Sequence, residues 1–467
     1  MIGLEDYRSQ IRETDGKILA LVKERLEVGA RVAETKHARG LPTIDTDAEQ
    51  TTMSNLMQIA GELGVEKRFA QRLGELLIEE TVRVEETTQP VLSKDQLLKG
   101  VFELTQKLIS QGRKVTRFEI GEPNFLPPRT VIQGLDATFR KKKVIGYGPS
   151  AGLPELRKII AVDLSKRHKT TIDPDQILVT PGARFGIFAT IASYVSALER
   201  VVIPQPAWPA YEECVNFVHG RVIQLNTRFE DNWEIDLDRL EQELKKGARL
   251  LVLNSPSNPT GKVIPLEKFK RTVDLAAKYG TMILSDEVYD RYVHSPGPSI
   301  LECDYDNFVY INSFSKQFSL TGWRIAYLVT TKPYALKIRR ALQTAITCVP
   351  EFVQNGALVA LKKAEPEARQ KIEAIMRKVE LTCRELSKID VSFHKPEGAF
   401  YVFPKANKPN FDSLTFAKQL LAKDGVSITP GQSFGDYKEF FRLAVSLPRA
   451  QIPSAIKKIG AAIDSWP

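Results

Sequence analysis

The stretch from Ser313 to Arg324 carries residue types that could form a nucleophilic site. Its sequence, SFSKQFSLTGWR, places Lys316 and Arg324 eight residues apart among serines and a glycine. A lysine amine attacks a carbonyl carbon only when it is neutral, so it needs a dry or cationic setting. A lone lysine after a strand is normally a surface residue, and Lys316 is therefore informative only together with its neighbours.

Three other stretches carry polar residues at the ends of strand-like runs or inside them. Asn258 begins the sequence NPTG, Asp286 and Tyr289 lie in DEVY, and Arg442 lies in FRLAVS. Taken singly, NPTG is a good turn and an acid at a strand end can cap the next helix. An arginine inside a strand is seldom buried without a partner. Their joint occurrence indicates a functional site more strongly than any one of them.

A further motif could bind a phosphate group. The sequence TPGAR, from Thr180 to Arg184, follows a strand-like run and begins a helical one. Backbone amides at the amino end of a helix bind phosphate, and Gly182 and Ala183 would supply them here.

Together these motifs resemble those of the class I aminotransferases, fold-type-I enzymes that use pyridoxal phosphate (PLP). The resemblance implies that Lys316 binds the cofactor covalently and moves a proton between the substrate and the cofactor. It implies that Asp286 pairs with the protonated ring nitrogen, and that Asn258 and Tyr289 contact the ring oxygen. The other cofactor contacts that it implies are Gly182, Ala183, Arg184, Ser313 and Arg324 around the phosphate, Tyr147 of the other subunit, and Trp208 on the ring.

The same resemblance implies where the substrate binds. Arg442 matches the arginine that grips the α-carboxylate with two hydrogen bonds, and Gly121 in GEPNF lines the same site. Arg184 stands where dicarboxylate-specific relatives carry a lysine, which favours aspartate or glutamate as one substrate. The alternative is that Arg184 is an ordinary surface arginine on the first turn of a helix.

The elements that would position these residues alternate between helices and short β-branched runs. Such alternation predicts an α/β fold with a mostly parallel sheet, and functional loops at the carboxyl ends of its strands. We expect an aminotransferase domain over 91–467. Its large cofactor-binding part would span about 140–345, and a smaller α/β domain would combine about 91–139 with 346–467. The predicted strands are 176–179, 200–203, 249–253, 282–285 and 308–311.

The first 90 residues predict a separate, all-helical domain. Apolar residues recur at spacings of three, four and seven between Leu4 and about His37, the pattern of one face of a long helix. A second helix through about Leu63 and a third from Val65 to about Glu86 follow. Three helices of such unequal length cannot bury a sizeable core alone, so we expect dimerisation.

Residues 4–86 resemble the all-helical chorismate mutases in their helix lengths and in several charge positions. Converting chorismate to prephenate is an intramolecular rearrangement, so the enzyme needs cations that orient two carboxylates and donors for the breaking ether oxygen. Lys36 and Glu85 stand at the family positions for that oxygen. The complete set that the resemblance implies is Arg8 (across the dimer), Arg25, Lys36, Asp45, Glu49, Thr81 and Glu85.

Two positions depart from the mutase pattern. Many relatives carry glutamine in place of Glu85, and a glutamate donates a hydrogen bond only when it is protonated. We therefore expect mutase activity that improves toward mildly acid pH, and a flat or alkaline-rising profile between about pH 5 and 8 would contradict this. Relatives usually carry arginine in place of Ala48, and its loss would weaken substrate binding or mark a non-catalytic domain.

The composition narrows the classes of protein to which this chain can belong. The chain has 467 residues with 43% apolar and 26% charged residues, typical of a globular protein. Its charged start is unlike a secretory signal, and no apolar run approaches the roughly 18–20 residues of a membrane span. We therefore expect a cytoplasmic protein without membrane contact. The 4 cysteines lack paired spacing and the 5 histidines lack ligand spacing, which predicts no metal site.

Charge is divided unevenly between the two parts. Residues 1–90 carry 12 Lys and Arg against 17 Asp and Glu, a net −5, whereas the remainder carries 54 against 40, a net +14. A basic catalytic part suits anionic small molecules. Nucleic-acid binding needs a clustered basic stripe. A transcription regulator fused to an aminotransferase-like domain needs a basic winged helix. The acidic helical segment argues against both classes of protein.

The fusion predicts a bifunctional enzyme of aromatic amino acid biosynthesis. It would convert chorismate to prephenate and then aminate prephenate, phenylpyruvate or 4-hydroxyphenylpyruvate with aspartate or glutamate as donor. The alternative is an aspartate aminotransferase whose N-terminal part is a non-catalytic regulatory module. Both active sites would borrow residues across an interface, which predicts a homodimer or a higher homo-oligomer.

Overall fold

The computed structural model describes residues 3–38, 46–88, 94–141 and 146–467. The chain divides into two compact units, residues 1–92 and 93–467. Among the described helices, none is long and apolar enough to cross a membrane.

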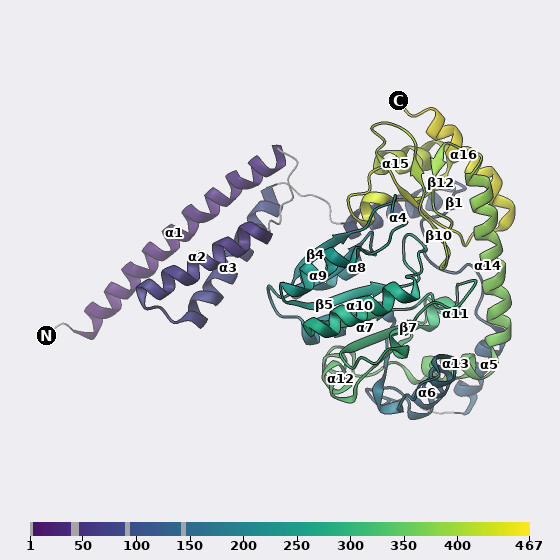
Figure 1. Cartoon of the computed structure of the whole chain (residues 1–467), viewed down its shortest axis with the longest axis horizontal. Coiled ribbons are helices and arrows are strands. Elements are labelled where there is room, and N and C mark those ends of the chain that lie inside the picture. Colours follow the sequence, from purple (N-terminus) through teal and green to yellow (C-terminus); the bar gives the residue numbers. More distant parts are fainter. Residues whose placement is uncertain (1–2, 39–45, 89–93, 142–145) are drawn as a thin grey trace. The chain divides into compact units, whose positions relative to one another are not determined.

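The N-terminal unit consists of three helices, α1 (Leu4–Ala38), α2 (Thr46–Leu63) and α3 (Lys67–Thr88). Helix α3 packs against both α1 and α2 (Figure 1). Gly29 of α1 lies against Thr81 of α3 so closely that a Cβ atom on Gly29 would come 2.7 Å from Thr81 Cγ2. The predicted three-helix domain is therefore confirmed.

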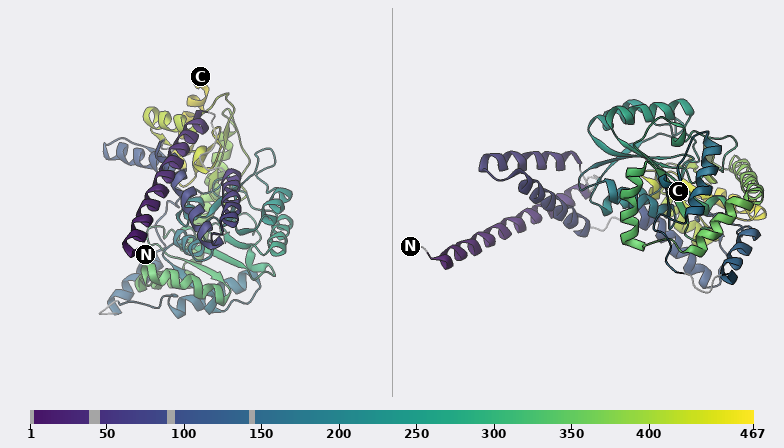
Figure 2. Two further views of the ribbon diagram at one scale, coloured as in Figure 1. Left: turned by 90° about the vertical axis from the view of Figure 1, so that its left-hand side faces the viewer. Right: turned by 90° about the horizontal axis from the view of Figure 1, so that it is seen from below.

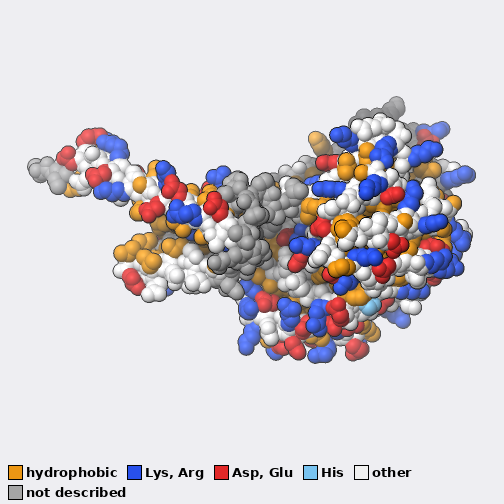
Figure 3. Space-filling model, turned by 90° about the horizontal axis from the view of Figure 1, so that it is seen from above, with side chains coloured by type: hydrophobic (Ala, Val, Ile, Leu, Met, Phe, Trp, Pro, Cys, Tyr) orange, Lys and Arg blue, Asp and Glu red, His pale blue; other side chains and the backbone are white. Residues whose placement is uncertain are grey.

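This unit has a small core for its size. Among its described residues, the buried apolar side chains are those of Ala60, Ala70 and Ile78. Many other apolar side chains remain exposed, and hydrophobic groups are visible on the surface of these helices in Figure 3. On α1 the exposed large apolar residues are Leu4, Tyr7, Ile11, Ile18, Leu19, Leu21, Val28 and Val32. An apolar face this long is consistent with the expected dimer, which stays a prediction.

The second unit is built on a seven-stranded sheet with the order β2-β8-β7-β6-β5-β3-β4. Strands β4, β3, β5, β6 and β7 are parallel, whereas β8 pairs antiparallel with both β2 and β7. The prediction of an α/β fold with a mostly parallel sheet is confirmed. The strands are β2 (Ile177–Thr180), β3 (Arg200–Gln205), β4 (Arg221–Asn226), β5 (Ala248–Asn254), β6 (Met282–Asp286), β7 (Phe308–Ser313) and β8 (Ala326–Thr330).

Helices cover both faces of this sheet, because its strands are apolar on both sides (Figures 1 and 2). On one face pack α7 (Ala183–Tyr194), α8 (Ala210–Phe217) and α12 (Lys332–Ile346). On the other pack α5 (Arg129–Lys141), α6 (Pro154–His168), α9 (Leu237–Lys245), α10 (Leu266–Tyr279) and α13 (Glu351–Lys363).

The domain boundaries within this unit differ from the expected ones. The predicted limits of about 139 and 346 would assign α5 and α13 to the smaller domain. Instead, α5 packs against α13 and α13 against α6, and Val131, Val353 and Ala357 share the core of the large sheet. Sequence pattern alone cannot show this, because an amphipathic helix does not reveal which apolar surface it covers.

The smaller domain collects short strands around helices from both ends of the unit. Its three-stranded sheet has the order β10-β14-β13, and β1 pairs with β12 and β9 with β11. Its helices are α4 (Lys94–Ser110), α14 (Glu365–Leu386), α15 (Ser413–Asp424) and α16 (Ile452–Asp464). Its strands are β1 (Thr116–Arg117), β9 (Val391–Ser392), β10 (Tyr401–Val402), β11 (Lys405–Ala406), β12 (Val426–Ser427), β13 (Thr429–Pro430) and β14 (Phe441–Ala444).

Candidate active site

Lys316 lies on the one-turn helix α11 (Phe314–Gln317), directly after strand β7. Ser313 caps this helix, since its Oγ accepts a hydrogen bond of 3.1 Å from the backbone N–H of Ser315. Lys316 Nζ donates to the carbonyl oxygen of Gly121 at 2.5 Å. Burial lowers the pKa of Lys316 to about 8, although the charge of Glu122 opposes this shift. The neutral amine, which a nucleophile requires, is therefore a minor but substantial form near physiological pH, unlike that of an ordinary lysine.

Asp286 ends the neighbouring strand β6, and its side chain is buried. The hydroxyl of Tyr211 donates to Asp286 Oδ2 at 2.6 Å, and the backbone N–H of Val288 donates to Oδ1 at 3.3 Å. Burial raises the pKa of Asp286 to about 6, while these hydrogen bonds and the charge of Lys316 pull it down. A buried carboxylate with few partners is suited to a cationic group such as a protonated ring nitrogen.

Asn258 and Tyr289 also come to this edge of the sheet, each with a defined partner. The backbone N–H of Asn258 donates to Asn254 Oδ1 at 2.8 Å, which fixes the NPTG turn after β5. The hydroxyl of Tyr289 lies 2.7 Å from that of Tyr401, a residue that the motifs did not predict. Both predicted residues are buried.

Arg442 is a buried arginine on β14, where it faces Thr429 of β13. Its Nη1 donates to Asn258 Oδ1 at 2.9 Å, and its Nη2 donates to the carbonyl oxygen of Glu119 at 2.8 Å. Its guanidinium carbon lies 4.7 Å from the centre of the Tyr401 ring. Within the described chain, Arg442 Nε has no hydrogen-bond partner. Because a buried, unpaired donor is unfavourable, this group is suited to a carboxylate ligand.

A cradle for an anion lies at the amino end of α7. Gly182 immediately precedes α7 with φ +89°, and a Cβ atom there would lie 2.1 Å from Arg324 Nη2. Only a glycine therefore lets the Arg324 guanidinium come this close to the first turn of the helix. Burial and the nearby charge of Arg184 lower the pKa of Arg324. A helix amino end beside two arginines is a suitable phosphate site.

Arg184 lies over Trp208, with its guanidinium carbon 4.7 Å from the ring centre. Trp208 in turn meets Tyr211 edge to face at 5.5 Å, and Tyr211 holds Asp286. Arg184 is thus placed on the aromatic side chain that is expected to cover the cofactor ring, where it could meet a substrate.

The structure brings together Lys316, Asp286, Asn258, Tyr289, Arg442, Gly121, Gly182, Ala183, Ser313, Arg324, Arg184 and Trp208 at one edge of the sheet. Tyr147 does not join these residues, because it is 91% exposed and makes no described contact with them. That exposure is compatible with a role across a dimer. The residues fit PLP, since a partly neutral lysine, a buried acid and an anion cradle lie together.

Two tyrosines of this site were missed by the sequence motifs. Tyr211 follows Trp208 by three residues in PAWPAY, which is a weak signal because buried aromatics are common. Tyr401 lies in EGAFY, far along the chain from the other motifs. Its place in the site depends on the pairing of β10 with β14.

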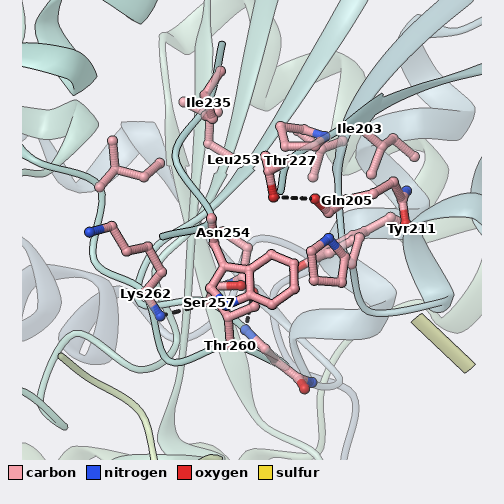
Figure 4. Close-up of a pocket in the computed structure, with 17 residues that line it drawn as sticks. Ile203, Gln205, Tyr211, Thr227, Ile235, Leu253, Asn254, Ser257, Thr260 and Lys262 are labelled. Carbon is pink, nitrogen blue, oxygen red and sulfur yellow. Dashed lines mark hydrogen bonds between the residues drawn. The ribbon is translucent and has the colours of Figure 1, made fainter. Parts of the chain in front are cut away.

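A cavity of about 50 Å³ adjoins the site (Figure 4). It lies at the carboxyl ends of β3, β4 and β5, and it shares Tyr211 and Asn258 with the site. Its polar lining includes Gln205, Thr227 and Lys262, and the hydroxyl of Thr227 donates to the carbonyl oxygen of Gln205 at 2.6 Å.

In the N-terminal unit, Arg25 and Thr81 come together between α1 and α3. Arg25 Nη1 donates to the carbonyl oxygen of Leu77 at 2.6 Å and to Thr81 Oγ1. Burial lowers the pKa of Arg25. Lys36 is half-buried on the same helix, three turns further along. Asp45 and the side chains of Glu49 and Glu85 lie outside the described residues.

Arg8 lies too far along α1 to join Arg25 in its own chain. The two are 17 residues apart on one helix, hence about 25 Å at 1.5 Å per residue. Arg8 is exposed and pairs with Glu5 at 3.1 Å. This separation is compatible with Arg8 serving the site of a second copy.

The fold and the lysine-centred site define a fold-type-I aminotransferase. Consistent with this, the model of the family "Aminotransferase class I and II" matches residues 113–459, and "Chorismate mutase type II" matches residues 7–86. The chain belongs to the class I and II aminotransferases and carries a chorismate mutase type II domain fused at its amino end, as predicted.

Known relatives match the aminotransferase part. A "Probable aspartate/prephenate aminotransferase" of Aquifex aeolicus is 32% identical over 371 residues, 77% of this chain and 93% of the relative. An aspartate aminotransferase of Sulfurisphaera tokodaii is 30% identical over 76% of this chain and 91% of the relative. The solved aspartate aminotransferase of Thermotoga maritima superposes with a TM-score of 0.75 at 30% identity, covering 80% of this chain and 98% of that one.

Proposed function

We propose that the chain catalyses two consecutive reactions of aromatic amino acid biosynthesis. The N-terminal domain converts chorismate to prephenate, and the aminotransferase domain aminates prephenate with aspartate or glutamate as donor. The observation that carries the second step is a site with two arginines, Arg442 beside Asn258 and Arg184 over Trp208. Two cations suit substrates with two carboxylates, which prephenate, aspartate and glutamate all have.

The aminotransferase half depends on PLP, which supplies, when bound, an electron sink that makes the Cα proton of an amino acid removable. Lys316 takes and returns that proton, because its amine is partly neutral at working pH. Asp286, oriented by Tyr211, would pair with the cationic end of the cofactor, and Asn258 and Tyr289 would contact its ring oxygen. Gly182, Ala183, Ser313 and Arg324 hold the phosphate, with Tyr147 of a second copy.

Substrate choice follows from the two arginines. Arg442 binds the α-carboxylate, and its unpaired Nε supplies a further donor. Arg184 binds the second carboxylate, the ring carboxylate of prephenate or the side-chain carboxylate of the donor. Phenylpyruvate and 4-hydroxyphenylpyruvate lack that group and would leave Arg184 without a carboxylate partner from the keto acid. The printed name of the Aquifex relative supports the choice of prephenate.

The mutase half needs only oriented cations and donors, because the rearrangement involves no nucleophile and no proton transfer. Arg25, held by Leu77 and Thr81, and Lys36 bind chorismate from one chain. Arg8 reaches the site of the partner copy, and Asp45, Glu49 and Glu85 complete it. Both halves therefore work in a homo-oligomer.

Two substitutions separate the two activities in the full chain. Lys316→Ala is expected to abolish amination of supplied prephenate and to leave chorismate consumption unchanged. Arg25→Ala is expected to do the reverse. Each activity is followed by LC–MS at neutral pH without acid quenching. If Arg25→Ala leaves the consumption of chorismate unchanged, the mutase assignment fails; if wild type aminates only oxaloacetate, the prephenate assignment fails.

A second candidate is an aspartate aminotransferase with a regulatory N-terminal module. It is favoured by Ala48, which replaces the usual arginine of catalytic mutases, and by relatives that are named aspartate aminotransferases. On this alternative, chorismate stays unconverted, whereas chorismate or an aromatic amino acid changes the rate of aspartate transamination.

A further inference from the structure

Tyr401 occupies the middle of the site although none of the cofactor or substrate motifs contains it. It is fully buried on β10, and its hydroxyl and its ring contact different site residues. A Cβ atom on Gly121 would lie 2.5 Å from the Tyr401 hydroxyl oxygen. Gly121, whose carbonyl oxygen holds Lys316, is therefore packed directly against this tyrosine.

The hydroxyl of Tyr401 is the described hydrogen-bond partner of the Tyr289 hydroxyl, at 2.7 Å. Each phenol has one proton to donate. When the cofactor is bound, the Tyr289 hydroxyl would donate its hydrogen bond to the anionic ring oxygen, because hydrogen bonds to charged acceptors are stronger. Tyr401 then donates to Tyr289 at 2.7 Å in preference to the carbonyl oxygen of Gly121, which lies 3.5 Å away. This hydrogen bond strengthens Tyr289 as a donor.

The ring of Tyr401 supports the substrate-binding arginine. The guanidinium carbon of Arg442 lies 4.7 Å from the Tyr401 ring centre and 5.0 Å from that of Phe434. Such stacking orients a guanidinium without using any of its N–H donors. Arg442 therefore keeps its donors for Asn258, Glu119 and a substrate carboxylate.

Tyr401 is itself held in place from both sides. β10 pairs with β14, so that Tyr401 lies opposite Ala444, two residues from Arg442. Just before it, the two carboxylate oxygens of Glu397 bind Lys262 Nζ at 2.9 Å and the backbone N–H of Val263 at 3.0 Å. These contacts anchor the segment to the turn that carries Asn258.

We propose that Tyr401 is a positioning residue that couples the carboxylate-binding arginine, Arg442, to the cofactor-contacting tyrosine, Tyr289. The Tyr401 hydroxyl acts on Tyr289, which contacts the cofactor, and the Tyr401 ring acts on Arg442, which binds the substrate. This inference rests on the proposed PLP-dependent function, because Tyr289 has the stated role only when the cofactor is bound.

The two parts of the side chain are tested separately with Tyr401→Phe and Tyr401→Leu in the full chain with PLP. Tyr305→Phe is a matched control, since it removes a tyrosine hydroxyl that donates to Thr281 at the opposite edge of the sheet. The primary readout is the pH at which the absorbance of the lysine-bound cofactor changes. The second readout is whether the KM for aspartate or kcat changes. Thermal unfolding checks that each variant is folded.

Tyr401→Phe is expected to raise the absorbance midpoint by about 0.5 to 1 pH unit, because the anionic ring oxygen loses support. It keeps the ring, so the KM for aspartate changes less than about threefold. Tyr401→Leu raises the midpoint similarly and also raises that KM about tenfold. Tyr305→Phe leaves both values unchanged.

Two results would overturn the inference, and they are distinguishable. If wild type shows the absorbance transition but both Tyr401 variants keep its midpoint and the KM, Tyr401 is only a core residue and the PLP site stands. If wild type shows no absorbance change with added PLP, the proposed function itself fails.

Discussion

Arg442 Nη1 donates a hydrogen bond of 2.9 Å to Asn258 Oδ1. This bond joins β14 of the smaller domain to the turn after β5 of the large sheet. Asn258 is expected to contact the cofactor and Arg442 the substrate. The two ends of the site therefore share one hydrogen-bond network.

Arg442→Lys should reduce kcat/KM for aspartate about 100-fold or more while leaving the absorbance of bound PLP in place. Lysine keeps the charge but cannot form the two parallel hydrogen bonds of a guanidinium, each charge-assisted bond being worth about 1.5 to 3 kcal/mol. Steady-state kinetics check this, with Arg449→Lys on the surface as control. A loss below threefold would mean that Arg442 does not bind the α-carboxylate.

Gly182→Ala should weaken PLP binding at least tenfold. The added Cβ would lie 2.1 Å from Arg324 Nη2, and alanine is strained at φ +89°. Gly186→Ala, inside α7, is the control, because its Cβ would meet nothing closer than Thr180 Oγ1 at 3.4 Å. Fluorescence titration of the cofactor-free protein measures both affinities, and equal values would contradict the proposed phosphate cradle.

The rate at which the cofactor-free protein captures PLP should rise with pH and level off above about pH 8. Only the neutral amine attacks, and burial lowers the pKa of Lys316 to about 8, so the reactive fraction grows as pH rises through that value. Stopped-flow absorbance measures the rate, with Lys316→Ala as the blank. A rate that keeps rising about tenfold per unit between pH 8.5 and 10 would indicate an ordinary lysine.

Arg8 and Arg25 should act in different copies of one mutase site. Arg8→Ala and Arg25→Ala are each expected to inactivate chorismate conversion. Mixing the two unfolded variants and refolding them should restore about one quarter of wild-type activity, because half the dimers are mixed and each has one intact site. Refolded wild type is the reference. If the mixture stays inactive while the reference recovers, Arg8 does not serve a partner site.

The motifs in the aminotransferase part predict a common location for their residues because each motif is a local signal. Asp286 ends a strand of a mostly parallel sheet, and Lys316, Asn258 and Gly182 follow other strands of that sheet. The carboxyl ends of such strands share one edge. Residue type and chain position were therefore enough to predict a common location.

The missed features depend on long-range packing. Tyr401 reaches Gly121 and Tyr289 through the pairing of β10 with β14. In the sequence, a tyrosine next to a phenylalanine indicates an ordinary core residue. The packing of α5 and α13 on the large domain likewise depends on tertiary structure, because the sequence of each helix does not show which apolar surface it covers. The proposed contact of Tyr147 with the cofactor phosphate requires a second copy of the chain.

The most direct test of the central claim gives the wild-type protein chorismate, ¹⁵N-labelled aspartate and PLP in one reaction at neutral pH. Products are followed by LC–MS without acid quenching, and Lys316→Ala serves as the control. The account predicts ¹⁵N-labelled arogenate, the product of prephenate amination, formed after prephenate appears, with prephenate alone in the control. Chorismate that stays unconverted, or prephenate that accumulates in wild type without an aminated product, would contradict it.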